Sequence, residues 1–156
     1  MALKVFLGSD HGGYELKEDL KKFLDESGYH VVDYGCYSAD PVDYPDIALL
    51  VAETVSQNPG ALGIIIDGAG IGSAITANKV PGIRAAHCHE AFTARNSREH
   101  NDANILTLGG RVIGVGLARE IVKVWLSSCF LGDRHARRVE KMMSVERKYI
   151  RESFSR

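Results

Sequence analysis

The segment of this chain that most constrains its fold is IIIDGAGIGS, residues 64–73. Its β-branched apolar run, typical of a buried strand, stops at Asp67, and glycines follow at alternate positions. Residues 74–79 then have the composition of a short helix. The pattern therefore predicts a strand, a tight turn and a helix N-terminus, where backbone N–H groups lack intrahelical partners and stabilise an oxyanion. A carboxylate beside such a cradle is what proton abstraction next to a carbonyl group requires.

Apolar runs and amphipathic stretches alternate along the rest of the chain. Strands are expected at 5–8, 29–34, 61–66, 83–87 and 105–108. Longer helices are expected at 14–27, 46–57, 91–100 and 115–127, with Asp46 as the cap of the second. No hairpin signal interrupts this succession, so we predict an α/β fold with a five-stranded parallel sheet and helices on both faces.

Polar residues follow four of the expected strands, at the edge where ligands bind in parallel sheets. They lie at 9–13, at Asp67, at 87–90 and at 109–111. We therefore expect catalytic residues to gather along one rim. A further polar cluster, 100–104, ends the helix expected at 91–100, and either a functional group or a plain helix stop accounts for it.

Composition narrows the class of protein. At 156 residues, 45% hydrophobic and 25% charged, the chain has the length of a single domain spanning 1–156. A formal net charge of -1 gives no basic excess for nucleic acid or a membrane surface. Cys36, Cys88 and Cys129 are odd in number and widely spaced, which argues against disulfides and favours the cytoplasm. No apolar run reaches the roughly 20 residues of a membrane span.

Two other kinds of site have weak support. His87 and His89 flank Cys88, but no third ligand follows at a known spacing, so we expect no metal there and expect Cys88 to pack near a strand end. A dinucleotide site would use Glu90 for the ribose, but the third glycine of the motif is displaced by one position. Asp67 has a simpler alternative role as the cap of the following helix, although three glycines exceed what a cap needs.

One long last helix is predicted at about 134–152. Arg134 and Arg138 are four residues apart on one face of it, where two guanidinium groups suit a phosphate, although a solvated basic face has the same pattern. A terminal helix beyond the last strand has little core of its own to join. We therefore expect it to pack on a neighbouring subunit.

Over essentially its whole length the chain resembles the ribose-5-phosphate isomerase B family, which includes the galactose-6-phosphate isomerase subunits. The resemblance is carried by GSDHGG at 8–13, DYP at 43–45, GAGIG at 68–72, ANK at 77–79, GIRAA at 82–86, REHNDAN at 98–104 and GDRH at 132–135. It implies a Rossmann-like three-layer α/β/α sandwich and an aldose–ketose isomerase of phosphorylated sugars. It also implies a homodimer or a dimer of dimers, with active sites at the subunit interface and no metal or organic cofactor.

The resemblance implies roles for individual residues as well. His100 would assist opening of the sugar ring, with Asp10 nearby, and Asn101 and Tyr44 would contact the sugar. Four side chains would hold the phosphate, partly across the subunit boundary: His11, Arg111, Arg134 and Arg138. The turn that begins at Gly68 would bind substrate, and four main-chain amides would receive the enediolate: those of Gly70, Ile71, Gly72 and Ser73.

The chain departs from that family at the reaction centre. Most members place a cysteine base at the position of Asp67 and a hydroxyl at that of Ala69, and some use a glutamate base at that of Ser73. A carboxylate also moves protons between adjacent carbons, as a glutamate does in triosephosphate isomerase. We therefore expect isomerisation through a cis-enediolate, with Asp67 as base and Ser73 or a water at the sugar oxygens. The alternative is a sugar-phosphate-binding protein or partner subunit without catalysis.

Overall fold

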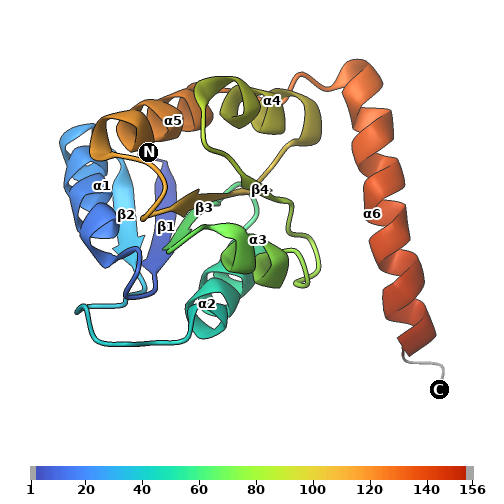
Figure 1. Ribbon diagram of the computed structural model, residues 1–156. Coiled ribbons are helices and arrows are strands. Elements are labelled where there is room, and N and C mark those ends of the chain that lie inside the picture. The colour runs from blue at the N-terminus through green and yellow to red at the C-terminus, as the bar shows by residue number, and fades with distance from the viewer. Residues whose placement is uncertain (1–2, 154–156) are drawn as a thin grey trace.

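Five strands form one all-parallel sheet in the order β2-β1-β3-β5-β4 (Figure 1). The computed structural model describes residues 3–153, with side chains to residue 150, so the ends of the expected 1–156 domain lie outside the described part. The strands are β1 (Lys4–Ser9), β2 (His30–Asp33), β3 (Leu62–Asp67), β4 (Ala85–His87) and β5 (Ile105–Gly109). The predicted α/β class and five-stranded parallel sheet are confirmed.

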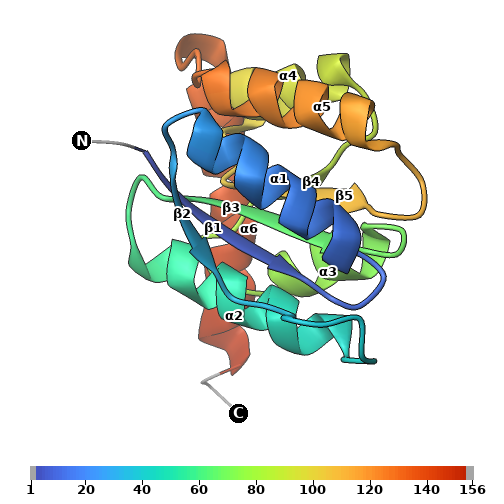
Figure 2. The same cartoon turned by 90° about the vertical axis from the view of Figure 1, so that its left-hand side faces the viewer.

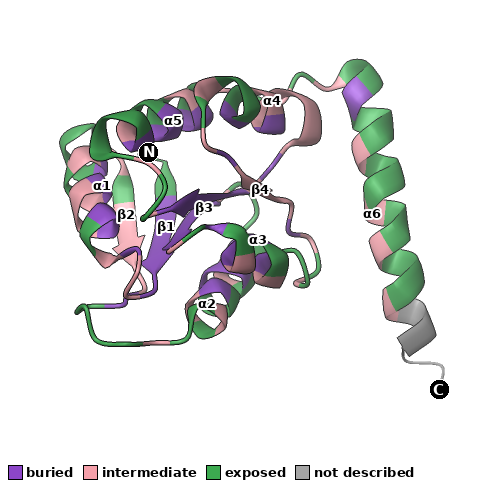
Figure 3. Ribbon diagram, viewed as in Figure 1, coloured by how far each residue is buried: buried purple, intermediate pink, exposed green. Residues whose placement is uncertain are grey.

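Helices cover both faces of this sheet and give the fold three layers (Figure 2). The covering helices are α1 (Tyr14–Glu26), α2 (Tyr44–Gln57), α3 (Ile71–Ala77), α4 (Ala91–Asn101) and α5 (Val115–Ser127), and they are followed by α6 (Asp133–Ser153). Side chains of α1, α4 and α5 share a buried cluster with one face of the sheet, and those of α2 and α3 share another with the opposite face. Figure 3 shows the buried residues in the strands and in these helices. Every residue of β3 and β5 is buried, as expected for parallel strands covered on both sides.

Two helices begin earlier than the sequence predicted. α2 starts at Tyr44 with Pro45 in its first turn, so Asp46 is not the cap but an acidic residue of that turn. Proline suits this place because its fixed φ is already helical. α3 starts at Ile71 because Gly70, with a φ of +79°, completes the turn out of β3.

The last helix, α6, stands beyond the β4 edge of the sheet (Figure 1). The Glu146 carboxylate of α6 accepts hydrogen bonds from the Gly82 amide at 3.0 and 3.1 Å. Met142, Val145 and Tyr149 are exposed large apolar side chains on the same helix. Such a surface is consistent with the expected packing on another subunit. Among the described residues, no helix is both long enough and apolar enough to cross a membrane.

A lysine is buried between α1 and β2. The Lys17 side chain is fully buried, and its ammonium group donates at 2.7 Å to both Asp33 and Glu18. Lys21 donates to the same Asp33 oxygen at 2.8 Å, and the Gly35 amide donates to the other oxygen at 2.9 Å. Burial alone would raise the pKa of Asp33, but the two ammonium groups and the amide outweigh it and hold the pKa below its usual value.

Acid is expected to destabilise the fold through Asp33. Its pKa is lower in the folded than in the unfolded chain, so its ionisation stabilises the fold fully above about pH 4, and this contribution is lost as the pH falls through the folded pKa. Asp33→Asn should cost about 3 kcal/mol at neutral pH, because Lys17 loses its buried partner. Between about pH 5 and about pH 3, the urea midpoint should fall further in the wild type than in this variant. Equal falls would contradict the assignment.

Candidate active site

Three loops meet at the carboxyl edge of the sheet, where the strand order reverses between β1 and β3. They follow β1, β3 and β5, and the Gly110 amide joins two of them by donating to the Asp67 carbonyl at 2.8 Å. The first two approach so closely that a Cβ on Gly12 would lie 3.1 Å from Gly68. Such a switch point is where ligands bind in open α/β sheets. The structure thus brings together the polar residues that follow these three strands.

A cavity of about 260 Å³ opens where the β1 and β5 loops meet. Its lining residues are His11, Gly12, Glu15, Leu16, Ala39, Gly110 and Arg111. The Val42 amide donates to Nδ1 of His11 at 3.3 Å, so the proton of the neutral ring lies on Nε2, where it is free to reach a phosphate oxygen. Arg111 lies over Gly68, whose Cβ would be 3.7 Å from its Cδ. A phosphate in this cavity would therefore meet a guanidinium group and an imidazole N–H.

Asp67 ends β3 and is buried at the base of the turn formed by residues 68–70, which is called the glycine turn below. Its Oδ1 accepts hydrogen bonds from the amide of Ala69, at 2.9 Å, and from that of Gly70. Its Oδ2 accepts from the amide and the hydroxyl of Ser73, at 2.9 and 2.5 Å. A carboxylate offers about four lone-pair sites, so all of them are used inside the turn. The carboxylate thus caps α3, and it reaches a substrate proton only after one of these donors leaves.

The four amides expected to bind the enediolate divide into two pairs. Those of Gly70 and Ser73 donate to the Asp67 carboxylate in this structure, so they would be open to a substrate only if that carboxylate moved. The reason is that a carboxylate, unlike a thiol, is a strong acceptor for them. The amides of Ile71 and Gly72 have no acceptor among the described residues, as is usual in the first turn of a helix. Tyr44 packs on Gly72, where an added Cβ would lie 2.5 Å from the tyrosine ring.

The remaining expected residues lie at the opposite end of the strands, where the strands begin. This second group consists of His100, Asn101, Arg134 and Arg138. α4 ends before β5 begins, so the length of β5, about 16 Å, separates its last turn from the glycine turn. His100 stacks on His135 with ring centroids 4.0 Å apart, and its Nδ1 lies 2.8 Å from the Asn96 amide nitrogen. Asp10, whose carboxylate accepts from the Gly13 amide at 3.1 Å, stays with the β1 loop. Within one chain, His100 is therefore not near Asp10.

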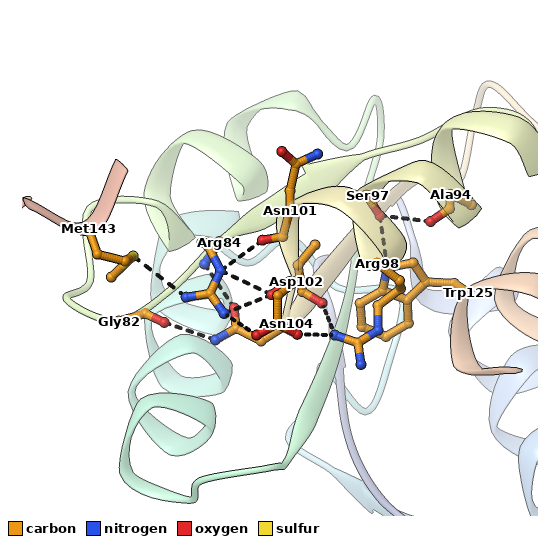
Figure 4. A network of polar contacts seen from close by, with 11 residues as sticks. Gly82, Arg84, Ala94, Ser97, Arg98, Asn101, Asp102, Asn104, Trp125 and Met143 are labelled. Atoms are coloured by element: carbon orange, nitrogen blue, oxygen red, sulfur yellow. Dashed lines mark hydrogen bonds and ion pairs between the residues drawn. The ribbon is translucent and has the colours of Figure 1, made fainter. Parts of the chain in front are cut away.

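A polar network holds the end of α4 (Figure 4). Arg84 donates through Nε to the carbonyls of Asn101 and Asp102, both at 3.0 Å. It also donates through Nη1 to the sulfur of Met143 in α6, at 3.6 Å. Arg98 donates to the Asp102 carboxylate at 3.2 Å, and the left-handed φ of 47° at Asp102 ends the helix. The Asn101 side chain points away from this network (Figure 4). Asp102, Arg84 and Arg98 thus end the helix. The side chains of His100 and Asn101 are therefore left for another role.

Sequence reasoning missed four residues near the site. Glu15, Leu16 and Ala39 line the cavity, but none of them belongs to a pattern that predicts binding. Thr107 lies fully buried within β5, and its hydroxyl donates to the Gly70 carbonyl at 2.8 Å. A single hydroxyl inside an otherwise apolar strand is the signal that would have pointed to it, because buried hydroxyl groups need partners.

The two histidines at the end of β4 pack on each other. The rings of His87 and His89 meet edge to face with centroids 4.2 Å apart. In the part of the chain that the structure describes, no group of three or more potential ligands is placed to hold a metal ion. Cys88 between them is buried just after β4, as predicted.

Comparisons with known proteins place these features in context. Residues 5–142 match the family model described as Ribose/Galactose Isomerase. Ribose-5-phosphate isomerase B of Escherichia coli (strain K12) is 43% identical over 145 residues, which cover 93% of this chain and 97% of that protein. D-erythrulose-4-phosphate isomerase of Pectobacterium atrosepticum is 40% identical over 144 residues, which cover 90% of this chain and 93% of that protein.

The same relationship holds in three dimensions. The structure of Clostridium thermocellum ribose-5-phosphate isomerase B matches this fold with a TM-score of 0.92 at 54% sequence identity. The match covers 94% of this chain and 99% of that one. The expected Rossmann-like α/β/α sandwich is therefore confirmed, and the chain is similar to isomerases that are named for sugar phosphates of different length.

Proposed function

The chain belongs to the ribose/galactose isomerase family, and we propose that it interconverts the aldose and ketose forms of a phosphorylated sugar of four to six carbons. The observation that carries the proposal is the Asp67 carboxylate, which accepts a hydrogen bond from the Ser73 hydroxyl at 2.5 Å. It lies beside the Ile71 and Gly72 amides, which have no acceptor among the described residues. A base next to an oxyanion cradle is what transfer of a proton between adjacent carbons needs. Ribose 5-phosphate with ribulose 5-phosphate is one candidate pair, and tetrose and hexose phosphates are others.

Asp67 is the proposed base, and Ser73 is the group that frees it. When the Ser73 hydroxyl turns from Oδ2 to a sugar oxygen, one lone pair of Oδ2 becomes available. The C–H bond next to the carbonyl breaks, its proton passes to Oδ2, and its electron pair forms the enediolate. The Ile71 and Gly72 amides stabilise the developing oxyanion. Asp67 then returns the proton to the neighbouring carbon, while Ser73 gives its proton to one sugar oxygen and takes one from the other.

A second copy of the chain is proposed to complete the site. In a homodimer, alone or paired into a tetramer, the α4 and α6 ends of one subunit would face the glycine turn of the other. His100 would bring an Nε2–H to the ring oxygen, because its Nδ1 accepts from Asn96, and Asn101 would contact the sugar. The phosphate would be held by His11 and Arg111 of one subunit and by Arg134 and Arg138 of the other. No step of this scheme needs a metal or an organic cofactor.

Solvent exchange tests the proposed function. The protein is incubated in deuterium oxide with aldose and ketose phosphates of four, five and six carbons. We expect at least one pair to interconvert, with deuterium entering at the carbon next to the carbonyl group. If a sugar phosphate raises the melting temperature but no exchange occurs, the protein binds without isomerising, and the proposal fails.

Arg138→Ala is expected to weaken binding more than catalysis. Because a charge-assisted hydrogen bond to phosphate contributes about 1.5 to 3 kcal/mol, KM should rise about 10- to 100-fold, with kcat changed less than about threefold. Steady-state kinetics on the substrate found above measure both constants. Arg137→Ala is the matched control, since it removes the same charge one residue away on another face of α6. Equal effects of the two variants would mean that the arginines form a solvated face.

A cytoplasmic location is also proposed. Cys36 and Cys88 are buried free thiols and Cys129 is an exposed one. Thiols persist in reducing compartments, whereas secreted proteins of this size usually pair them.

A further inference from the structure

Thr107 and His87 lie beneath the glycine turn, and the mechanism above gives them no role. Thr107 is fully buried in β5, and its hydroxyl oxygen lies 2.8 Å from the Gly70 carbonyl oxygen and 3.1 Å from Nδ1 of His87 on β4. A buried hydroxyl costs free energy unless its hydrogen bonds are made. These two contacts therefore account for the presence of a hydroxyl in this strand.

The direction of the two hydrogen bonds follows from their chemistry. A carbonyl oxygen cannot donate, so the Thr107 proton points to Gly70, and the Thr107 oxygen accepts from His87. The proton of the neutral His87 ring therefore lies on Nδ1. Burial and the neighbouring His89 lower the pKa of His87, which favours the neutral ring. The donors thus run in one direction, from His87 through Thr107 to the turn.

This hydrogen bond decides where the first amide of α3 points. The peptide group between Gly70 and Ile71 is planar and trans, so its C=O and N–H bonds point in opposite directions. Because Thr107 holds the carbonyl toward β5, the Ile71 N–H points away from the sheet. The turn is closely packed on its inner side, where a Cβ on Gly70 would lie 2.5 Å from the His87 ring and 2.7 Å from Leu108.

We propose that Thr107, held by His87, is a positioning residue that aims the Ile71 amide at the oxyanion of the enediolate. The proposal rests on the proposed function, because an aimed amide matters only if an oxyanion forms there. A donor that is already oriented needs no reorganisation when charge develops. The contribution is therefore made in the transition state, and its loss is expected in the chemical step instead of in substrate binding.

Thr107→Val is the direct test, because it keeps the β-branched shape and removes the hydroxyl. We expect kcat to fall about 10- to 100-fold, with KM changed less than about threefold. Affinity for a phosphorylated aldonohydroxamate, which resembles the enediolate, should fall by a similar factor, whereas affinity for the matching sugar-alcohol phosphate should not. Thr107→Ser should restore most of the loss. The matched control is Thr54→Val, because Thr54 also donates to a carbonyl, that of Leu50 at 2.8 Å, but on the exposed side of α2.

His87→Phe gives a second variant that keeps a ring against Gly70 and removes only the donor to Thr107. It should lower kcat about 3- to 10-fold, and it should reduce affinity for the hydroxamate more than affinity for the sugar-alcohol phosphate. Unchanged kcat and hydroxamate affinity in folded Thr107→Val would overturn the proposal. Equal loss of both ligands together with a lower melting temperature would also overturn it, since that is a purely structural effect. If the wild type turns over no sugar phosphate, or binds the hydroxamate no better than the sugar-alcohol phosphate, the proposed function itself is contradicted. This outcome is measured on the wild type alone, so it is distinguishable from failure of the Thr107 proposal.

Discussion

Asp67→Asn is expected to lower kcat by at least about 10³-fold. The side-chain amide has no lone pair basic enough to take a proton from carbon, although it has nearly the size and shape of the carboxylate. The proposed phosphate ligands, His11 and Arg111, lie on other loops, so affinity for inorganic phosphate should change less than about threefold. Stopped assays for turnover and calorimetry for phosphate measure the two effects. Deuterium exchange at the substrate carbon should disappear together with turnover.

A second substitution distinguishes the role of Asp67 as a base from its role as a helix cap. The distinction is needed because Asp67 accepts four hydrogen bonds from its own turn. In Asp67→Cys a thiolate is still able to take the proton, but it accepts those hydrogen bonds poorly. If Asp67 is the base, this variant stays active and the acid limb of its pH profile moves toward about pH 8.5, where thiols titrate. A cap alone predicts a lower melting temperature with no such movement. Near-wild-type turnover in Asp67→Asn would place the base elsewhere.

The turn around Asp67 could be predicted from sequence because each part of it depends on short-range chemistry. The β-branched residues before it favour a buried strand, and Gly70 supplies the left-handed φ that the turn into α3 needs. The parallel sheet could be predicted for a similar reason, since alternating strand and helix patterns leave few other arrangements. The ends of helices depend on local propensity and were predicted less accurately. The start of α2 at Tyr44, two residues before the predicted start, is an example.

The contacts inside the site could not be predicted in this way. Whether the Ser73 amide faces a substrate or the Asp67 carboxylate depends on distances that only the folded turn defines. Thr107 is one hydroxyl in a run of buried apolar residues, and the sequence does not show that it lies under Gly70. Both contacts arise from residues separated in the chain, so no spacing rule describes them.

The sequence also could not show how far apart the two groups of expected residues lie in one chain. The 100–104 cluster follows α4 and precedes β5, whereas Arg111 follows β5, so the strand itself separates them. Arg84 joins the end of α4 to Met143 of α6, so the 100–104 cluster cannot move toward the glycine turn without losing those hydrogen bonds. A single chain therefore keeps the two groups of expected residues apart, and the proposed site needs a second copy of the chain to bring them together.

Two inactive variants are consequently expected to restore activity when they are combined. Asp67→Asn removes the proposed base, and His100→Phe removes the ring-opening group while keeping a ring stacked on His135. If each site takes Asp67 from one subunit and His100 from the other, a mixed dimer has one site with both changes and one intact site. Random mixing gives half mixed dimers, so co-expression should recover about a quarter of wild-type activity, from variants that are each at least about 100-fold slower alone. Native mass measurement would establish that mixed dimers form. If they form and activity stays at the sum of the two variants, the halves do not combine across subunits.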